Sequence, residues 1–506
     1  MDDPGALLRQ AVQLHQQGRL DTAATLYRRV LEAAPRQFDA LHLLGVIERQ
    51  RGNPARGAEL IGAALQVDPD QARAHCNLGA ALQDLDRPVE ALASYDAALR
   101  LDPRYALAWN NRGNALRRLG RHGEALDSYE RALGIQDAYP EAWCQRAMLL
   151  NDLGRHEEAA ASAERALALR RGYADALLAL GNALQGMDLP ADAVAAYDAA
   201  LAAAPRQADA WCARGAALKK SGDLAAALDS YDRALALRPD YALAAHYRAN
   251  ALRALGRIED ARAAYRQALA LGADANDIAF ALAALGEGAL PEAAPPDYVR
   301  ALFDGYAGHF ERHLVEQLGY RTPALLEALL ARHGVAPGAG DAWHVADLGC
   351  GTGLCAPFLR PLAARLTGVD LSQKMLDRAA RLASYDALAC AEIGAWLAGQ
   401  EDGCDLLVAA DVLVYIGALD TLFARAHAAL KAGGRFAFSC EALEAADAAD
   451  AAQGYAIQVS NRFAHAPAYV ERCAARAGFA VVEARQAVLR REHGEDVQGW
   501  VVLLAR

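Results

Sequence analysis

Cysteine is sparse in this sequence, with nine residues in a chain of 506, and no two of them are spaced as CxxC. The sequence also lacks the HExxH pattern in which two histidines on one helix face bind zinc. We therefore expect neither a disulfide framework nor a metal site. An odd number of cysteines in a long chain is typical of a reduced, cytoplasmic protein.

Long apolar runs and a basic surplus are also missing. The first residues, MDDPGALLRQ, lack the basic region and apolar core of a signal peptide, and no apolar stretch approaches the length that spans a bilayer. The formal net charge is -11, and the excess acid lies mostly in the second half. Because binding to phosphates requires a basic surface, the composition predicts neither a nucleic-acid partner nor a membrane partner.

What the first half contains is a pattern that returns every 34 residues without an insertion. A small residue recurs at one phase, a tyrosine at a second, and a proline closes many of the units. The phased glycines are Gly45, Gly79, Gly113, Gly181 and Gly215, and the phased tyrosines are Tyr27, Tyr95, Tyr129, Tyr197, Tyr231 and Tyr265.

Each unit predicts two short helices. The small residue lets the paired helices approach, the tyrosine is expected to pack against the neighbouring unit, and the proline ends the second helix. One unit cannot bury its apolar face alone, so the units must stack. The pattern resembles tetratricopeptide repeats, which implies an α-solenoid of eight units over residues 4–273.

The resemblance implies that the groove of the solenoid holds a protein or peptide partner. Two phases of amide side chains could bond the backbone of such a peptide, or they could be solvated polar residues on helices. They are Asn77, Asn111 and Gln145 in one phase, and Asn114, Asn182 and Asn250 in the other. The phased cysteines Cys76, Cys144 and Cys212 are interpreted as packing residues. Residues 274–296 then read as a capping helix followed by a linker rich in proline and alanine.

From residue 343 onward the pattern changes to apolar strands alternating with helical segments. Strands are predicted at residues 343–348, 366–371, 404–411, 435–441, 479–485 and 499–505, and helices at residues 355–366, 372–383 and 421–434. Such alternation favours an α/β, doubly wound, mostly parallel sheet. Ligands bind such sheets beyond the carboxyl ends of the strands.

The first of these strands runs into a glycine loop, Gly349, Gly351 and Gly353. The third glycine comes one position earlier than in the dinucleotide fingerprint GxGxxG. Asp347 precedes the loop, and Asp370 ends the next strand, where a carboxylate can accept hydrogen bonds from a ribose diol. The motifs DLGCGTG and GVDLS resemble those of class I S-adenosyl-L-methionine-dependent methyltransferases. The resemblance covers residues 297–506 and implies a Rossmann-like methyltransferase domain.

That resemblance assigns roles to individual positions around the cofactor. The loop from Gly349 through Cys350 and Gly351 to Gly353 would let the backbone pass the methionine part. Asp347 would orient the loop and the amino group of the cofactor. Asp370 and Leu371 would hold the ribose.

Further positions follow in the same way. Glu392, after the third strand, would lie near the adenine amino group, or it is an ordinary acid at a strand end. Ala409 to Asp411 would line the methyl-transfer site. Phe303, Tyr306 and Phe310 share one face of the leading helix, either as core residues or as a lid in which Tyr306 touches the cofactor.

On the acceptor side we single out Tyr415, Arg462 and His465. The resemblance places Tyr415 facing the methyl group. Histidine is a natural base near neutral pH, and Arg462 could bind a carboxylate or phosphate of the substrate. The sequence DVLVY after the fourth strand lacks the Asn/Asp-Pro-Pro-aromatic motif of enzymes that methylate amino groups of bases or of glutamine.

The architecture as a whole resembles bacterial predicted methyltransferases that carry an N-terminal repeat array. It implies a methyltransferase that acts on a small-molecule or protein acceptor, with repeats that bind a protein. An alternative is a repeat adaptor in which the methyltransferase fold is only a scaffold, although the intact acids and glycines argue against it. Repeats of this kind also resemble those of O-linked glycosyltransferases, but the glycine loop does not fit a nucleotide-sugar domain.

Overall fold

The computed structural model describes residues 3–306, 314, 318–335, 343–401, 403–443, 453–492 and 494–506. The chain divides into two compact units, residues 1–237 and residues 238–506, and each is described by itself. Among the described residues, no helix combines the length and the apolar character that a membrane crossing requires.

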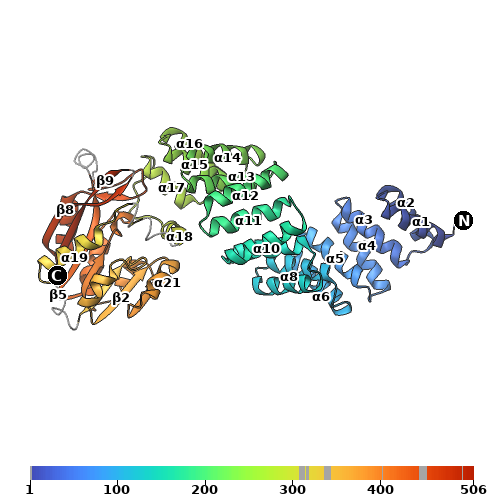
Figure 1. The fold of residues 1–506 in the computed structure, drawn as a ribbon, viewed down its shortest axis with the longest axis horizontal. Coiled ribbons are helices and arrows are strands. Elements are labelled where there is room, and N and C mark those ends of the chain that lie inside the picture. Colours follow the sequence, from blue (N-terminus) through green and yellow to red (C-terminus); the bar gives the residue numbers. More distant parts are fainter. Residues whose placement is uncertain are drawn as a thin grey trace. The chain divides into compact units, whose positions relative to one another are not determined.

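The first unit consists of paired helices stacked in chain order (Figure 1). They are α1 (Pro4–Gln16), α2 (Leu20–Ala33), α3 (Phe38–Gln50), α4 (Pro54–Val67), α5 (Ala72–Asp84), α6 (Pro88–Leu101), α7 (Ala106–Arg118), α8 (His122–Ile135), α9 (Pro140–Asp152), α10 (His156–Leu169), α11 (Ala174–Gly186), α12 (Pro190–Ala203), α13 (Ala208–Lys220) and α14 (Leu224–Leu237). The predicted α-solenoid of two-helix units is confirmed.

The phased glycine and tyrosine form one contact within each pair. A Cβ atom at Gly113 of α7 would lie 2.5 Å from Cε1 of Tyr129 on α8, and at Gly79 of α5 it would lie 2.6 Å from Cε1 of Tyr95 on α6. Both tyrosines are fully buried. The ring thus fills the space over the glycine of its own unit.

One of the two amide phases is explained by the same tyrosines. The hydroxyl of Tyr129 donates to Oδ1 of Asn114 at 2.8 Å, and the hydroxyl of Tyr197 donates to Oδ1 of Asn182 at 2.8 Å. The amide oxygens of this phase thus accept the hydrogen bond of a buried phenol. The phased cysteines are buried as packing residues, as predicted.

The second unit begins with one further helix pair, α15 (Ala242–Ala254) and α16 (Ile258–Ala270). Among the described residues, α17 (Ala275–Ala284), α18 (Pro296–Tyr306) and α19 (Thr322–Arg332) follow. The side chain of Asp274 caps α17 by accepting from the backbone N–H groups of residues 276 and 277. The capping helix expected from the sequence is therefore present.

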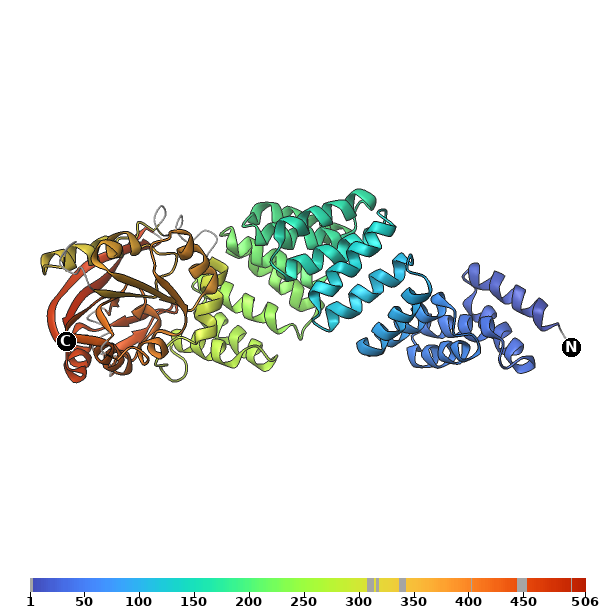
Figure 2. The same cartoon turned by 90° about the horizontal axis from the view of Figure 1, so that it is seen from below.

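The described residues of the rest of the second unit form a nine-stranded sheet with helices beside it (Figure 1 and Figure 2). The strands are β1 (His344–Leu348), β2 (Arg365–Asp370), β3 (Ala387–Cys390), β4 (Cys404–Ala409), β5 (Leu430–Ala442), β6 (Tyr455–Ile457), β7 (Phe463–His465), β8 (Ala480–Glu492) and β9 (Glu495–Ala505). The order β3-β2-β1-β4-β5 is parallel throughout, and β5 then pairs with β7 in parallel and with β9 antiparallel. The predicted doubly wound α/β fold is confirmed.

The connecting helices differ from prediction at two places. The helix expected over residues 421–434 ends at Ala429, and residues 430–434 already belong to β5. The helix expected over residues 355–366 is only the short α20 (Ala356–Leu359) followed by a 3₁₀ turn at Arg360–Leu362. Pro361 lacks a backbone N–H and its ring clashes with the preceding turn, so the helix cannot continue. The other helices of the described residues here are α21 (Gln373–Arg381), α22 (Ile393–Leu397), α23 (Asp420–Ala429) and α25 (Pro467–Ala477), with a 3₁₀ turn at Leu413–Tyr415.

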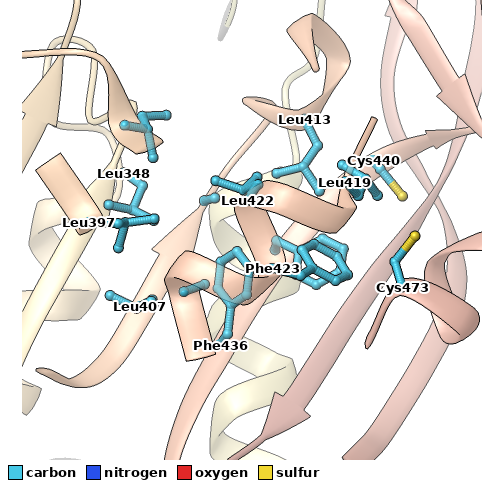
Figure 3. Packing of buried hydrophobic residues seen from close by; sticks show 14 of the residues in the cluster. Leu348, Leu397, Leu407, Leu413, Leu419, Leu422, Phe423, Phe436, Cys440 and Cys473 are labelled. Atoms are coloured by element: carbon cyan, nitrogen blue, oxygen red, sulfur yellow. The ribbon is translucent and has the colours of Figure 1, made fainter. Parts of the chain in front are cut away.

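The core of the second unit lies between the sheet and α23 (Figure 3). Phe423 of α23 meets Phe436 and Phe438 of β5, with ring centroids 6.0 and 5.4 Å apart. All three side chains are fully buried. This packing fixes the central strands, whose carboxyl ends carry the candidate site.

Candidate active site

The glycine loop after β1 has a backbone that only glycine adopts without strain. Gly349 has φ +68°, and a Cβ there would lie 2.3 Å from Cγ2 of Val412. Gly351 and Gly353 also have positive φ. The N–H of Gly349 donates to the carbonyl of Val369 at 2.7 Å, which ties the loop to the end of β2.

Asp370 at the end of β2 is joined to the same loop. Its Oδ2 accepts from the N–H of Gly351 at 2.9 Å, and its Oδ1 accepts from the N–H of Ser372 at 2.8 Å. Burial raises the pKa of Asp370 above its ordinary value, although these backbone donors oppose the rise. Each carboxylate oxygen retains a lone pair for a further donor.

A cavity of about 750 Å³ opens at this edge of the sheet. It lies at the end of β1, which pairs with β2 on one side and with β4 on the other. The strand order reverses there, and open α/β sheets bind ligands at such a switch point. Of the residues singled out from the sequence, its wall contains Tyr306, Gly349, Gly351, Asp370, Leu371, Glu392, Asp411, Tyr415 and Arg462. Those that do not line it are Asp347, Cys350, Gly353, Ala409 and His465.

Asp347 is buried behind the loop. Its Oδ2 accepts from the hydroxyl of Tyr385 at 2.7 Å, and the residue is 1% exposed. Burial raises the pKa of Asp347 to about 7, although the hydroxyl of Tyr385 opposes the rise. The partner of its carboxylate is thus Tyr385, and Cys350 is likewise buried.

Glu392 lines the cavity but also has a local role. Its two carboxylate oxygens accept from the N–H groups of Gly394 at 2.8 Å and Ala395 at 2.6 Å, which caps the N-terminus of α22. A capping side chain of this kind stabilises a helix by about 1 kcal/mol. The acid at this position is thus explained by the helix, and a contact with adenine would come in addition.

Helix α18 covers the cavity from one side. The Ser372 hydroxyl donates to Oδ1 of Asp304 at 2.5 Å, which holds α18 against the start of α21. Phe303 and Tyr306 line the cavity, and the ring of Phe303 meets Tyr415 edge-on at 5.6 Å. These positions suit the predicted lid. Phe310, the third aromatic of that prediction, lies outside the described residues.

The segment between α17 and α18 forms backbone hydrogen bonds with the wall of the cavity. The N–H of Ala294 donates to the carbonyl of Tyr415 at 2.9 Å, and the carbonyl of Glu292 accepts from Gly417 and Ala418 at 2.8 Å each. Phe280 of α17 and several linker residues also line the cavity. What reads in the sequence as a linker is therefore a structural part of the site.

The far wall of the cavity carries a cluster of charges, which we call the acid–arginine cluster. Its members are Asp411, Glu441, Arg462, Arg490 and Glu492. Arg490 donates from Nη1 to Asp411 at 2.9 Å, from Nε to Glu492 at 2.7 Å, and from Nη2 to Glu441. Arg462 pairs with Glu441, Nε to Oε1, at 3.1 Å, and with Glu492.

The two acceptor-side candidates in the segment 462–465 have different surroundings. Arg462 reaches the cavity, but its charge is already paired within the cluster. His465 lies inside β7 with no exposed surface, and its Nε2 donates to the carbonyl of Ile416 at 2.9 Å. Burial lowers the pKa of His465 to about 4. A neutral, buried imidazole away from the cavity is not placed to act as a base there. We therefore do not propose His465 as the base on the acceptor side.

Sequence reasoning missed Glu441, Arg490 and Glu492, although one signal for them was available. Glu441 is a charged residue that follows the mostly apolar run FAFSC, and a buried charge there needs a partner. Its partner Arg490 stands 49 residues further along the chain. Spacing along the sequence could not have identified that pair.

Comparison with known proteins agrees with this geometry. A methyltransferase domain model matches residues 346–436, and tetratricopeptide repeat models match residues 8–143, 140–173, 208–241 and 246–272. The chain thus carries a tetratricopeptide repeat array followed by a methyltransferase domain of Rossmann-like fold.

Among individual relatives, the trans-aconitate 2-methyltransferases of Paracidovorax citrulli and Delftia acidovorans are 39% and 38% identical over 93 and 97 residues. These segments are 18% and 19% of this chain, and they span only 36% of the length of each relative. Among solved structures, the tetratricopeptide repeat protein YrrB is 26% identical over 37% of this chain and 97% of its own, with a TM-score of 0.32. A thermophilic tetratricopeptide repeat protein of Thermus thermophilus is 28% identical over 36% of this chain and 100% of its own, also with a TM-score of 0.32.

Proposed function

We propose that this chain is an S-adenosyl-L-methionine-dependent methyltransferase whose repeat array binds a protein or peptide partner. The observation that carries the proposal is the bond between the glycine loop and Asp370 at the mouth of the cavity. This hydrogen bond places the glycine backbone next to the carboxylate of Asp370 at the switch point of the sheet.

The residues of the cavity fit this cofactor. Asp370 offers carboxylate lone pairs for the ribose hydroxyls, and the loop around Gly349 and Gly351 leaves room for the chain beside them. Leu371, Ile393 and Val412 supply apolar surface of the kind that suits a purine. When bound, the cofactor supplies a methyl group activated by a sulfonium sulfur.

The work of the protein is then to orient the acceptor and exclude water. Phe303 and Tyr306 of α18 cover the cavity, and the hydrogen bond between Ser372 and Asp304 holds that helix in place. Burial raises the pKa of the Tyr415 hydroxyl above its ordinary value, so this group keeps its proton at neutral pH and can donate a hydrogen bond. The methyl acceptor in this proposal is a small molecule or a protein.

Calorimetric titration of the full chain with S-adenosyl-L-methionine tests the proposal. We expect one site per chain, competition by S-adenosylhomocysteine, and no binding of ATP, which shares only the adenosine part. A folded chain that binds neither sulfur-containing ligand would contradict the proposal. The adaptor alternative would then be favoured, and the partner of the repeats would become the question.

A further inference from the structure

The acid–arginine cluster gives the cavity an excess of negative charge. Three carboxylates, those of Asp411, Glu441 and Glu492, surround the two guanidinium groups of Arg462 and Arg490. The side chain of Arg490 is 3% exposed and that of Glu441 is 4% exposed. Charges removed from water in this way interact strongly with whatever enters beside them.

The guanidinium groups are engaged by the protein itself. All three nitrogens of Arg490 donate to carboxylates of the cluster. Arg462 donates from Nη2 to Glu492, and its Nε lies 3.1 Å from Oε1 of Glu441 as an ion pair. The described residues that line the cavity include no lysine or histidine, so they offer no further cation to a substrate.

The remaining surface of the acceptor side is mostly apolar. It comes from α17, the following segment and α18, with Phe280, Ala294, Pro295 and Val299 among the lining residues. A ligand that fits between this surface and the cluster has an apolar body and a polar end that is not an anion.

We propose that the methyl acceptor is an amine carried on an apolar body, an inference that rests on the proposed function. A carboxylate acceptor would meet one uncompensated negative charge in a buried place. An alcohol is a far weaker nucleophile and needs a strong base to remove its proton, and His465 is buried and does not line the cavity. An amine supplies its own lone pair, and its N–H groups suit the carboxylates of Asp411 and Glu492.

The transfer step balances with these groups. The bound ammonium first gives a proton to a cavity carboxylate or to water. The nitrogen lone pair then forms the new bond to the methyl carbon, and the carbon–sulfur bond breaks with its electron pair going to sulfur. The positive charge moves from sulfur to nitrogen, and the product then loses a proton to water or to a cavity carboxylate. The cavity therefore faces one cation before and after transfer, which matches its charge. The absence of an Asn/Asp-Pro-Pro-aromatic motif does not conflict, because that motif serves conjugated amino groups rather than aliphatic amines.

The test uses the full chain saturated with S-adenosylhomocysteine and three probes of one shape. Phenethylamine, phenethyl alcohol and hydrocinnamate carry an ammonium, a hydroxyl and a carboxylate on the same apolar body, and trans-aconitate serves as a fourth, polyanionic probe. We expect the amine to bind at least about tenfold more tightly than hydrocinnamate, a difference of about 1.4 kcal/mol. We also expect trans-aconitate to bind most weakly.

Two variants distinguish the effect of the acid–arginine cluster on probe binding from the effect of surface charge in general. Glu492→Gln leaves two carboxylates beside two guanidinium groups, and we expect it to shrink the preference for amine over carboxylate at least about threefold. Glu471→Gln removes a carboxylate from the exposed face of α25 and should leave the preference unchanged. Equal or tighter binding of either carboxylate probe overturns the inference, and so does a failure of the amine to bind. Because S-adenosylhomocysteine binding is measured first, failure of the proposed function would be seen separately.

Discussion

The guanidinium of Arg253, on α15, donates to Oδ1 of Asn461, which stands 208 residues further along the chain between β6 and β7. It also donates to the carbonyl of Val459 at 3.3 Å. Asn461 is buried with φ +63°, and its amide donates to the hydroxyl of Tyr298 on α18 at 3.1 Å. The next residue is Arg462 of the acid–arginine cluster. The last helix pair of the repeat pattern and the wall of the cavity are therefore held by one asparagine.

Replacing Arg253 by alanine should loosen that wall. The change leaves the buried amide oxygen of Asn461 without its donor, which costs about 1–3 kcal/mol of stability. We expect a lower unfolding temperature and faster hydrogen exchange in residues 455–465, measured by mass spectrometry on the full chain. Arg257→Ala is the matched control, because that side chain forms only an exposed pair with Asp260. Equal exchange in both variants would show that Arg253 does not hold the hairpin.

The contact between glycine and tyrosine predicts a second pair of variants. Gly113→Ala would place a methyl group 2.5 Å from the ring of Tyr129, and we expect it to destabilise the repeat array by about 1–3 kcal/mol. Gly62→Ala lies in the middle of α4 with no atom within 4 Å of the added carbon. It should stabilise by about 0.5–1 kcal/mol, because alanine favours a helix. Thermal unfolding followed by circular dichroism checks both, and a harmless Gly113→Ala would contradict the packing.

The pKa of Asp347 predicts how stability depends on pH. Burial raises it from 3.8 in the unfolded chain to about 7 in the folded protein, so the folded state holds this proton more tightly. Stability contributed by this residue therefore falls as the pH rises between those values, by about 1.4 kcal/mol per pH unit. Asp347→Asn lacks the titration and keeps an acceptor for Tyr385. We expect the free energy of unfolding of Asp347→Asn, relative to that of the natural protein, to rise steadily from pH 4 to pH 7. Both proteins are measured without cofactor.

Denaturant unfolding at several pH values measures that difference. Other titrating groups, including His465 with its opposite sign, are common to both proteins and cancel. A difference in stability that stays constant with pH would show that Asp347 is ionised in the folded protein at low pH as well.

The features that sequence reasoning predicted are those that lie within one segment of chain. Gly349 and Asp370 are recognised because each directly follows an apolar strand, and parallel strands bring their ends together. The repeats are recognised because each helix pair restates the same contact, as Gly79 and Tyr95 do. Local pattern was sufficient in both cases.

The features that it missed depend on the direction of a side chain or on a distant partner. His465 is next to Ala464 in a strand, and only the pairing of that strand decides that its side chain is buried and does not line the cavity. Arg490 meets Asp411 across 79 residues of sequence. The sequence could not decide the role of Glu392, because an acid after a strand can either cap the next helix or contact a bound cofactor.

The contribution of Asp370 to cofactor binding tests the account most directly. We would titrate the full chain and its Asp370→Ala variant with S-adenosyl-L-methionine by calorimetry, with Asp377→Ala on the exposed face of α21 as control. The account predicts that Asp370→Ala weakens binding at least about thirtyfold, as expected for the loss of hydrogen bonds to a charged group worth about 2–3 kcal/mol, while Asp377→Ala binds like the natural protein. Undiminished binding by a folded Asp370→Ala variant would contradict it.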